Sequence, residues 1–259
     1  MQKSLTVVHT SDVHLDSRDT DAAPDGFRSR AERAFSGVVD AVREEDADLL
    51  LIAGDLFDNN RVDDSNIDFV YRQFERLPCP VVMLPGNHDV HDEASVWNRF
   101  DFGEAGEHVH GLMSHAGDSV VLDDIGACVW GKAMAEHAPE NYPLVGTPDR
   151  QERYWNIGMA HGQVVERRVG QGSSPITRDE IRTSGFDYLA LGHIHVWADH
   201  SEGDTIAVYS GSPVAHFAGA GGGHVAVVDL CPANGVRVRS RQVSNWERTM
   251  ERSNGGFPF

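Results

Sequence analysis

The stretch Asp48-Leu49-Leu50-Leu51-Ile52-Ala53-Gly54-Asp55-Leu56-Phe57-Asp58 decides how this chain is expected to fold. It leads a block of branched apolar residues into Gly54 and then into the carboxylates of Asp55 and Asp58. A short apolar run that a glycine ends is typical of a strand covered on both faces. Open α/β sheets carry their chemistry at the C-terminal ends of such strands, where Asp55 stands. Taken alone, the two aspartates suit a polar turn equally well.

The segments around this stretch predict a parallel α/β unit. Leu5–Thr10 is short and β-branched, so we expect it to form the first strand. Between residues 26 and 45, apolar side chains recur at helical spacing and predict an amphipathic helix. Strand, helix and strand in this order form a right-handed parallel crossover. A second helix, with apolar residues from Ile67 to Leu77, leads to a third strand at Val81–Leu84.

Further strands are expected along the rest of the chain, although residues 90–154 are harder to interpret. In that part the predicted strands are 119–122 and 127–130, and His108, His110 and His115 have no ligand-like spacing and are expected at the surface. Beyond it we expect strands within 155–162, 186–195, 206–210, 225–230 and 236–243, and a helix from about residue 177. We therefore expect one catalytic domain over residues 1–244 and a loose tail over 245–259, with no capping domain.

Composition indicates a globular protein of the cytoplasm. The chain has 259 residues, 40% of them hydrophobic, which is enough for one large domain or for one domain with a small lobe. Its three cysteines are far apart and odd in number, which fits a reducing compartment better than a disulfide framework. The N-terminus becomes polar too soon for a secretory signal, and no stretch approaches the roughly 18 apolar residues of a membrane span.

The net charge is strongly negative, with 40 acidic residues against 22 basic ones and a total of −18. Affinity for phosphate backbones comes largely from clustered lysine and arginine, so this balance opposes non-specific binding to nucleic acid. A local basic surface is an alternative route to DNA binding. The arginines that would form it are also typical of solvated loops and strand edges. The candidates are Arg167, Arg168, Arg237, Arg239 and Arg241.

Several of the strand-like runs are followed by side chains that can bind a metal ion. Asp12 and His14 follow the first strand and are two residues apart, so in extended chain they face the same side. The tight turn Pro85-Gly86-Asn87-His88-Asp89 follows a later strand. Together with residues at the other predicted strand ends, these segments supply seven oxygen and nitrogen donors: Asp12, His14, Asp55, Asn87, His161, His193 and His195.

Seven donors are enough for two divalent ions, with Asp55 as a bridge and water completing each shell. Two such ions about 3.5–4 Å apart clamp a phosphoryl group and generate a hydroxide for its hydrolysis. The set contains no thiolate, so Mn, Fe, Zn and Mg all remain candidates and Mn is favoured. His88 can serve as a further ligand or as a general acid, since imidazole titrates near neutral pH.

The order Asp-x-His, Gly-Asp-x-x-Asp, Gly-Asn-His-Asp, His and Gly-His-x-His resembles the calcineurin-like binuclear metallophosphoesterase superfamily. The resemblance implies an α/β fold, a four-layer αββα sandwich of two mixed β-sheets flanked by helices. It implies that one metal is held by Asp12, His14, Asp55 and His195, and the other by Asp55, Asn87, His161 and His193. It also implies that His88 is a catalytic histidine that binds no metal, that Asp58 orients it, and that Asp89 supports the turn.

A narrower resemblance, to the SbcD-type DNA repair exonucleases, rests on the blocks His9–Ser17, Ala34-Phe35, Ala53–Asp58, Phe186–His195 and Tyr209–Pro213. It implies hydrolysis of DNA phosphodiesters, with an SMC-like ATPase as partner. Two alternatives stay open. A phosphodiesterase or phosphatase for a small or nucleotide substrate needs no large basic surface. A catalytically idle binding module would use the metals structurally, but it would have no need of His88 as an acid.

Overall fold

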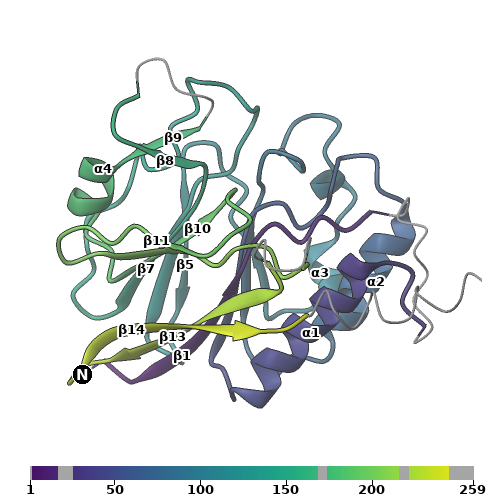
Figure 1. The fold of residues 1–259 in the computed structure, drawn as a ribbon, viewed down its shortest axis with the longest axis horizontal. Coiled ribbons are helices and arrows are strands. Elements are labelled where there is room, and N and C mark those ends of the chain that lie inside the picture. Colours follow the sequence, from purple (N-terminus) through teal and green to yellow (C-terminus); the bar gives the residue numbers. More distant parts are fainter. Residues whose placement is uncertain (1, 17–25, 169–173, 216–221, 245–259) are drawn as a thin grey trace, which may run out of the picture.

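Two six-stranded β-sheets packed face to face form the centre of the molecule (Figure 1). The computed structural model describes residues 2–16, 26–168, 174–215 and 222–244. The expected tail, residues 245–259, lies outside these residues, so the domain boundary at residue 244 stays a prediction. No helix among the described residues is long and apolar enough to cross a bilayer.

The first sheet is mixed, with four parallel strands and an antiparallel pair at one side. Its strands, in spatial order, are β14 (Gly235–Gln242), β13 (His224–Cys231), β1 (Leu5–Thr10), β2 (Leu49–Ala53), β3 (Val81–Leu84) and β4 (Val109–Gly111). The four strands from β1 to β4 are parallel, and β13 runs antiparallel to both β1 and β14.

The second sheet is also mixed. Its order is β11 (Ala198–Asp199), β12 (Ile206–Tyr209), β10 (Tyr188–Gly192), β7 (Trp155–His161), β6 (Ala127–Gly131) and β5 (Asp118–Leu122). The central strands β12, β10, β7 and β6 are parallel, and the outer strands β11 and β5 are antiparallel to their neighbours. A separate pair, β8 (Gln163–Val165) and β9 (Pro175–Thr177), lies beyond β7 in the chain.

Strand β2 is apolar throughout because both of its faces are covered. Leu49 and Leu51 point into the core between the two sheets, where they join Ile157 and Tyr188 of the second sheet. Side chains alternate along a strand, so Leu50 and Ile52 point the other way, into the core beneath the helices. The predicted doubly covered strand is therefore confirmed.

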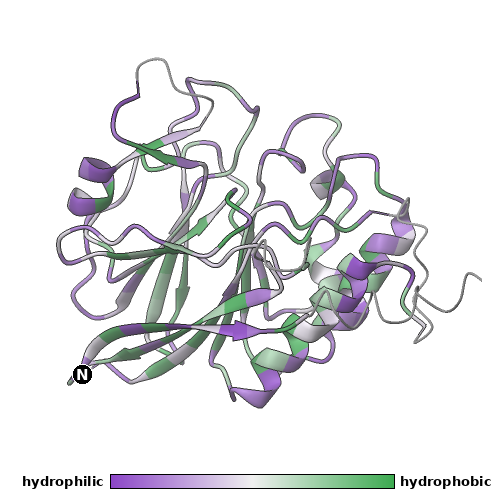
Figure 2. Ribbon diagram, in the orientation of Figure 1, coloured by the Kyte–Doolittle hydropathy of each residue, from purple (hydrophilic) through white to green (hydrophobic). Residues whose placement is uncertain are grey.

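Helices cover the outer face of each sheet, which gives the predicted four-layer α/β arrangement. On the first sheet lie α1 (Arg30–Glu44), α2 (Asp64–Phe74), the short α3 (Phe102–Ala105) and a 3₁₀ turn at Val96–Asn98. Figure 2 shows green, apolar sheets and helices whose purple, polar side faces outward. On the second sheet the described helix is α4 (Arg178–Thr183), whose N-terminus carries a capping box of Thr177 and Glu180.

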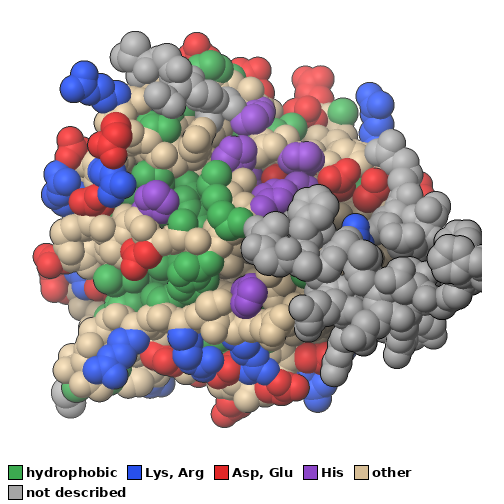
Figure 3. Space-filling model, in the orientation of Figure 1, with side chains coloured by type: hydrophobic (Ala, Val, Ile, Leu, Met, Phe, Trp, Pro, Cys, Tyr) green, Lys and Arg blue, Asp and Glu red, His purple; other side chains and the backbone are tan. Residues whose placement is uncertain are grey.

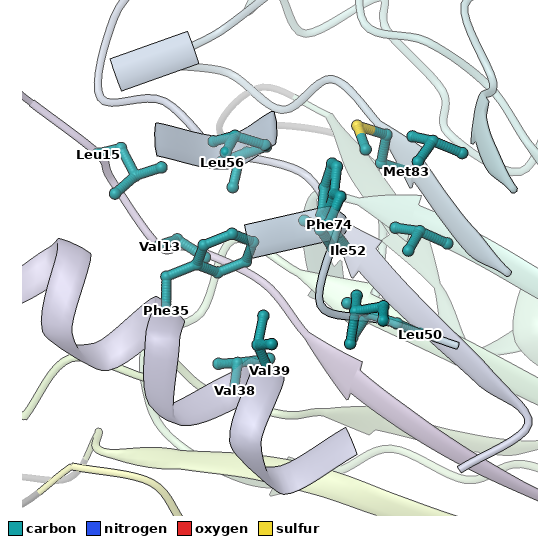
Figure 4. Close-up of a cluster of buried hydrophobic side chains, with 14 of the residues drawn as sticks. Val13, Leu15, Phe35, Val38, Val39, Leu50, Ile52, Leu56, Phe74 and Met83 are labelled. Atoms are coloured by element: carbon teal, nitrogen blue, oxygen red, sulfur yellow. The ribbon is translucent and has the colours of Figure 1, made fainter. Parts of the chain in front are cut away.

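The buried face of α1 follows from its sequence. Ser29 caps the helix by accepting a hydrogen bond from the N–H of Glu32, and the apolar residues then recur on one side. Phe35, Val38 and Val39 lie on this side, in the cluster between the helix and the sheet, and the ring of Phe35 meets that of Phe74 of α2 edge-on (Figure 4). The helix predicted within residues 26–45 is thus found at Arg30–Glu44.

Candidate metal centre

The loops that follow β1 and β2 are joined by backbone hydrogen bonds at one edge of the first sheet. The N–H of Asp12 donates to the carbonyl of Gly54 at 3.0 Å, and the N–H of His14 donates to the carbonyl of Asp55 at 3.1 Å. Six described non-glycine residues have a positive φ, a conformation that side chains disfavour. Four of the six are predicted ligands, so strained backbone is concentrated here. They are Asp12, His14, Asp55 and His193.

Asp55 lies between the two halves of the predicted ligand set. Its carboxylate is buried, and Oδ2 lies 3.3 Å from Nε2 of His161 and 3.8 Å from Nε2 of His14. The other oxygen, Oδ1, accepts a hydrogen bond of 2.9 Å from the backbone N–H of His88. One carboxylate therefore faces histidines from both sheets, as a bridging ligand must.

The first half of the set consists of Asp12, His14 and His195. Nε2 of His14 lies 3.2 Å from Nε2 of His195, which in turn lies 3.5 Å from Oδ1 of Asp12. The carboxylate of Asp12 is fully buried and also accepts the backbone N–H of His193. Two ring nitrogens and a buried carboxylate that converge in this way fit a divalent cation.

The second half is arranged around the side-chain oxygen of Asn87. This oxygen lies 3.0 Å from Nε2 of His161 and 2.8 Å from Nδ1 of His193. Nδ1 of His161 lies 2.8 Å from the carbonyl of Ala53, to which it donates. This bond orients the ring and directs Nε2 of His161 toward Asp55 and Asn87, as the outer partner of a metal-binding histidine does.

The structure thus brings all seven predicted ligands together from five strand ends. Their ligand atoms form groups within 4.8 Å of one another, among them Asp12–His14–His195 and Asp12–Asp55–His161. Figure 3 shows purple histidine side chains gathered in a group on one face of the molecule. The donors are carboxylate and amide oxygens and imidazole nitrogens, so the residues fit a centre of two divalent ions.

Burial and charge lower the pKa of two of these histidines and raise the pKa of the other two. Burial lowers the pKa of His193 to about 4 and also lowers the pKa of His195. Burial likewise acts to lower the pKa of His161, but the charge and hydrogen bond of Asp55 outweigh it and raise that pKa to about 9. Burial disfavours the charge of Asp55, yet the charges of His161 and His14 lower its pKa. Burial also acts to lower the pKa of His14, but the hydrogen bond of Asp58 and the charge of Asp55 outweigh it and raise that pKa. The metal-free centre therefore carries protons where a cation would bind.

His88 lies at the open side of the centre. Its side chain is 44% exposed, and its Nδ1 lies 2.9 Å from the backbone carbonyl of Asp58. The carboxylate of Asp58 is farther from this ring, at 3.7 Å, and closer to Nδ1 of His14, at 3.2 Å. Asp58 therefore contacts His88 mainly through its backbone, whereas its carboxylate contacts the predicted ligand His14.

Asp89 joins the turn that bears Asn87 and His88 to the turn that bears Asp55. Its fully buried carboxylate accepts backbone N–H groups from Gly86 at 2.7 Å, Phe57 at 3.2 Å and Asp55 at 3.3 Å. Burial and the nearby charge of Asp55 raise the pKa of Asp89 to about 7. These bonds agree with the supporting role expected for this residue.

Three glycines allow the strand ends to approach one another. A Cβ on Gly54 would lie 2.2 Å from Nδ1 of His161, and one on Gly86 would lie 2.2 Å from Oδ1 of Asp55. A Cβ on Gly192 would lie 1.9 Å from the carbonyl oxygen of Ala53. No side chain fits at such distances, which explains why a glycine stands at the end of these strands.

Sequence reasoning missed one histidine near the centre. His137 lies in the segment after β6, and its ring meets the ring of His193 edge-on, with 5.8 Å between centroids. No motif or regular spacing marks this position. Of the three histidines expected at the surface, His115 is exposed, whereas His108 and His110 are half-buried.

Most of the arginines considered for a basic surface are neutralised in the described structure. Arg168 forms an ion pair with Glu180, and its guanidinium also lies 4.0 Å from the centre of the Tyr142 ring. On β14, both Arg239 and Arg241 pair with Glu45, and Arg241 also pairs with Glu44. These pairs weaken the case for a local basic surface.

Comparison with known proteins agrees with the fold. Residues 5–197 match the family model described as "Calcineurin-like phosphoesterase". Over 233 residues the chain is 31% identical to "Uncharacterized metallophosphoesterase YhaO" of Bacillus subtilis (strain 168). This match covers 83% of the chain and 54% of the relative, so the chain spans about half the length of that protein.

Solved structures show the same fold at low sequence identity. The crystal structure of TT1561 of Thermus thermophilus has a TM-score of 0.58 and 12% identity, over 93% of this chain and 100% of that one. Purple acid phosphatase PPD1 from yellow lupin (Lupinus luteus) seeds has a TM-score of 0.56 and 15% identity, over 95% of this chain and 52% of that one. At these identities the likeness concerns the fold alone.

Proposed function

Because the chain belongs to the calcineurin-like phosphoesterase family, a group of metal-dependent phosphoesterases, we propose that it hydrolyses phosphodiester bonds with two divalent ions. The observation that carries this proposal is the position of Asp55 between His14 and His161, with the other donors grouped on either side. We propose Mn²⁺ as the metal, since the donors are oxygen and nitrogen atoms without a thiolate.

Different residues of the chain have different roles in the proposed hydrolysis. When bound, two divalent ions hold the phosphoryl group and lower the pKa of an attacking water. Asp12, His14, Asp55 and the donors around Asn87 would hold these ions. The Nδ1–H of His88 donates to the carbonyl of Asp58, so its Nε2 is directed to the open side of the centre, where it can protonate the leaving oxygen.

DNA is the proposed substrate, and an SMC-like ATPase is the proposed partner. Both rest on the resemblance to SbcD-type nucleases, whose blocks include the stretches that build the centre, Ala53–Asp58 and Phe186–His195. A DNA end or a single strand fits this proposal best, because neither needs the long basic surface that binds duplex DNA.

A second candidate is a small or nucleotide diester. The ion pairs of Arg168, Arg239 and Arg241 favour it, as does the net charge of −18, because a small substrate needs only the centre itself. This candidate uses the same metal centre and the same role of His88 as the nuclease. The two candidates differ only in the part of the substrate beyond the reacting phosphate.

One assay separates these candidates. The protein with Mn²⁺ is offered bis-p-nitrophenyl phosphate, a cyclic nucleotide, and labelled single- and double-stranded DNA. Cleavage of DNA supports the nuclease, and turnover of the small diesters alone supports the second candidate. No turnover of any substrate would leave the metals a structural role and overturn the proposed function.

The variant His88→Ala tests the chemistry. Loss of a general acid costs about 10²–10⁴-fold in rate, so kcat should fall by that amount while the bound metal, measured by elemental analysis, is unchanged. His110→Ala, which removes a histidine from β4, is the matched control and should retain wild-type turnover. Equal rates for wild type and His88→Ala would remove His88 from the mechanism.

A further inference from the structure

We propose that His137 binds a phosphoryl oxygen of the substrate at the metal centre, an inference that rests on the proposed function. Its ring meets the ring of His193 edge-on, with centroids 5.8 Å apart and planes at 65°. Burial and the charge of His161 lower the pKa of His137, and the charges of Asp55 and His88 also act on it. His137 is therefore adjacent to the His161–His193 side of the centre.

Two backbone hydrogen bonds hold the loop of His137 against the segments that carry the site. On one side, the N–H of His91, three residues after His88, donates to the carbonyl of Met134 at 2.8 Å. On the other side, the N–H of Ser174 donates to the carbonyl of Ala138 at 3.1 Å. The loop is thus fixed on both sides of His137.

Ser174 connects this loop directly to the strand end that carries His161. Its carbonyl accepts the N–H of Gln163 at 3.1 Å, and its hydroxyl accepts a hydrogen bond of 2.8 Å from the side chain of Asn141. A Cβ on Gly162 would lie 2.2 Å from this same carbonyl oxygen, so the approach of the two segments requires glycine. The position of His137 is therefore coupled to that of His161.

Other histidines of the same region use their ring nitrogens to hold the backbone. His91 contacts the carbonyl of Met113, His108 that of Phe74, and His115 that of His91. Within the described residues, His137 makes the ring contact with His193 and no hydrogen bond, and it is exposed. Its N–H is thus not used by the described residues and is available to a ligand.

An imidazole N–H can donate a hydrogen bond to a charged phosphoryl oxygen. Such bonds are stronger than neutral ones, and losing one should weaken phosphate binding by about 10- to 100-fold. The bond can form in both the bound substrate and the transition state. Its loss should therefore raise KM and leave kcat nearly unchanged.

The test compares wild type, His137→Ala and His137→Asn, all loaded with Mn²⁺. KM and kcat are measured with bis-p-nitrophenyl phosphate, and the inhibition constant is measured with inorganic phosphate. For His137→Ala we expect both KM and the inhibition constant to rise by about 10- to 100-fold. His137→Asn keeps an N–H donor and should recover part of the loss, and the control His110→Ala should match wild type.

Unchanged KM and inhibition constants in His137→Ala would overturn the inference. Loss of bound metal in this variant would also overturn it, since His137 would then be a ligand of the metal. If wild type shows no turnover, direct calorimetric binding of phosphate replaces the kinetic constants. Phosphate binding that depends on His137 would then support the inference while the proposed hydrolase fails, and no phosphate binding would overturn both.

Discussion

The carboxylate of Asp55 lies 3.3 Å from Nε2 of His161, a contact that joins the two sheets at the edge where the site forms. Asp55 follows β2 of the first sheet, and His161 ends β7 of the second. Both side chains are buried, so their attraction is weakly screened. It raises the pKa of His161 to about 9 against the effect of burial, and it lowers the pKa of Asp55.

This pair predicts that metal affinity rises with pH. A cation cannot bind Nε2 of His161 while that nitrogen carries a proton, so the proton must leave on binding. Below pH 9 His161 is protonated in the metal-free protein. Affinity for Mn²⁺ should therefore rise by roughly tenfold or more per pH unit between pH 6.5 and 8.5.

Calorimetry in two buffers of different ionisation enthalpy measures the proton that is released. At least one proton per protein is expected near pH 7.5, because the pKa of His14 is raised as well, and His161→Asn should release fewer. An affinity that does not change over this pH range would show that His161 is neutral before the metal binds.

Asp89→Asn should destabilise the protein and weaken the metal centre. The carboxylate of Asp89 accepts three backbone N–H groups, from Gly86, Asp55 and Phe57. An asparagine would direct an NH₂ group at one of these donors, which costs about 1–3 kcal/mol. The melting temperature should fall by roughly 2–4 °C for each kcal/mol.

Thermal denaturation at pH 8, with and without Mn²⁺, measures this cost, because most Asp89 carboxyls are then ionised. The matched control is Asp124→Asn, which changes an exposed aspartate outside the site. A melting temperature equal to that of wild type would show that the two turns are held together by other contacts.

The central strand and the ligands could be predicted from sequence because local patterns determine them. Leu49–Ala53 is apolar at every position, and such a run is typical of a strand that is covered on both faces. Each predicted ligand lies at the end of a strand or shortly after it, and the parallel strands of a sheet end at the same edge. The arrangement of the strands in two sheets came instead from the family resemblance, since periodicity does not show which strands pair.

Other features depend on contacts that are distant in sequence. Strand β4 was not predicted, because its three residues, Val109–Gly111, carry too little periodicity. His137 was missed because its position depends on hydrogen bonds that Met134 and Ala138 make with distant segments. The contact between the Asp58 carboxylate and His14 likewise depends on how the loops after β1 and β2 pack together.

Gly192→Ala should separate the two sheets at the centre. Its methyl group would lie 1.9 Å from the carbonyl oxygen of Ala53, which also accepts the hydrogen bond from Nδ1 of His161. Relief of this clash would cost about 1–3 kcal/mol and turn the ring of His161 away from its orientation. Metal affinity should fall by about 10- to 100-fold, as on loss of an outer partner of a ligand.

The matched control is Gly235→Ala, at a glycine with φ of +73° and open space around its Cβ. It should lose about 1 kcal/mol of stability from its backbone conformation and leave metal affinity unchanged. Equal metal affinities in the two alanine variants would contradict a role for Gly192 in the centre.

The ion pairs of β14 predict that its arginines contribute little to DNA binding. Arg239 and Arg241 pair with Glu44 and Glu45 near the C-terminal end of α1. The double variant Arg239→Gln, Arg241→Gln should change DNA affinity by less than about threefold, because these charges are already neutralised. Fluorescence anisotropy with labelled DNA over a series of salt concentrations measures both the affinity and its dependence on salt.

The reverse variant, Glu44→Gln with Glu45→Gln, leaves the same arginines unpaired. It should raise DNA affinity and steepen the salt dependence, because each phosphate contact adds about 0.9 to the slope of log K against log salt. If the arginines already bound DNA in the wild type, their removal would instead lower the slope by about 2. That result would place DNA on β14 and show that DNA phosphates displace the glutamates from the two arginines.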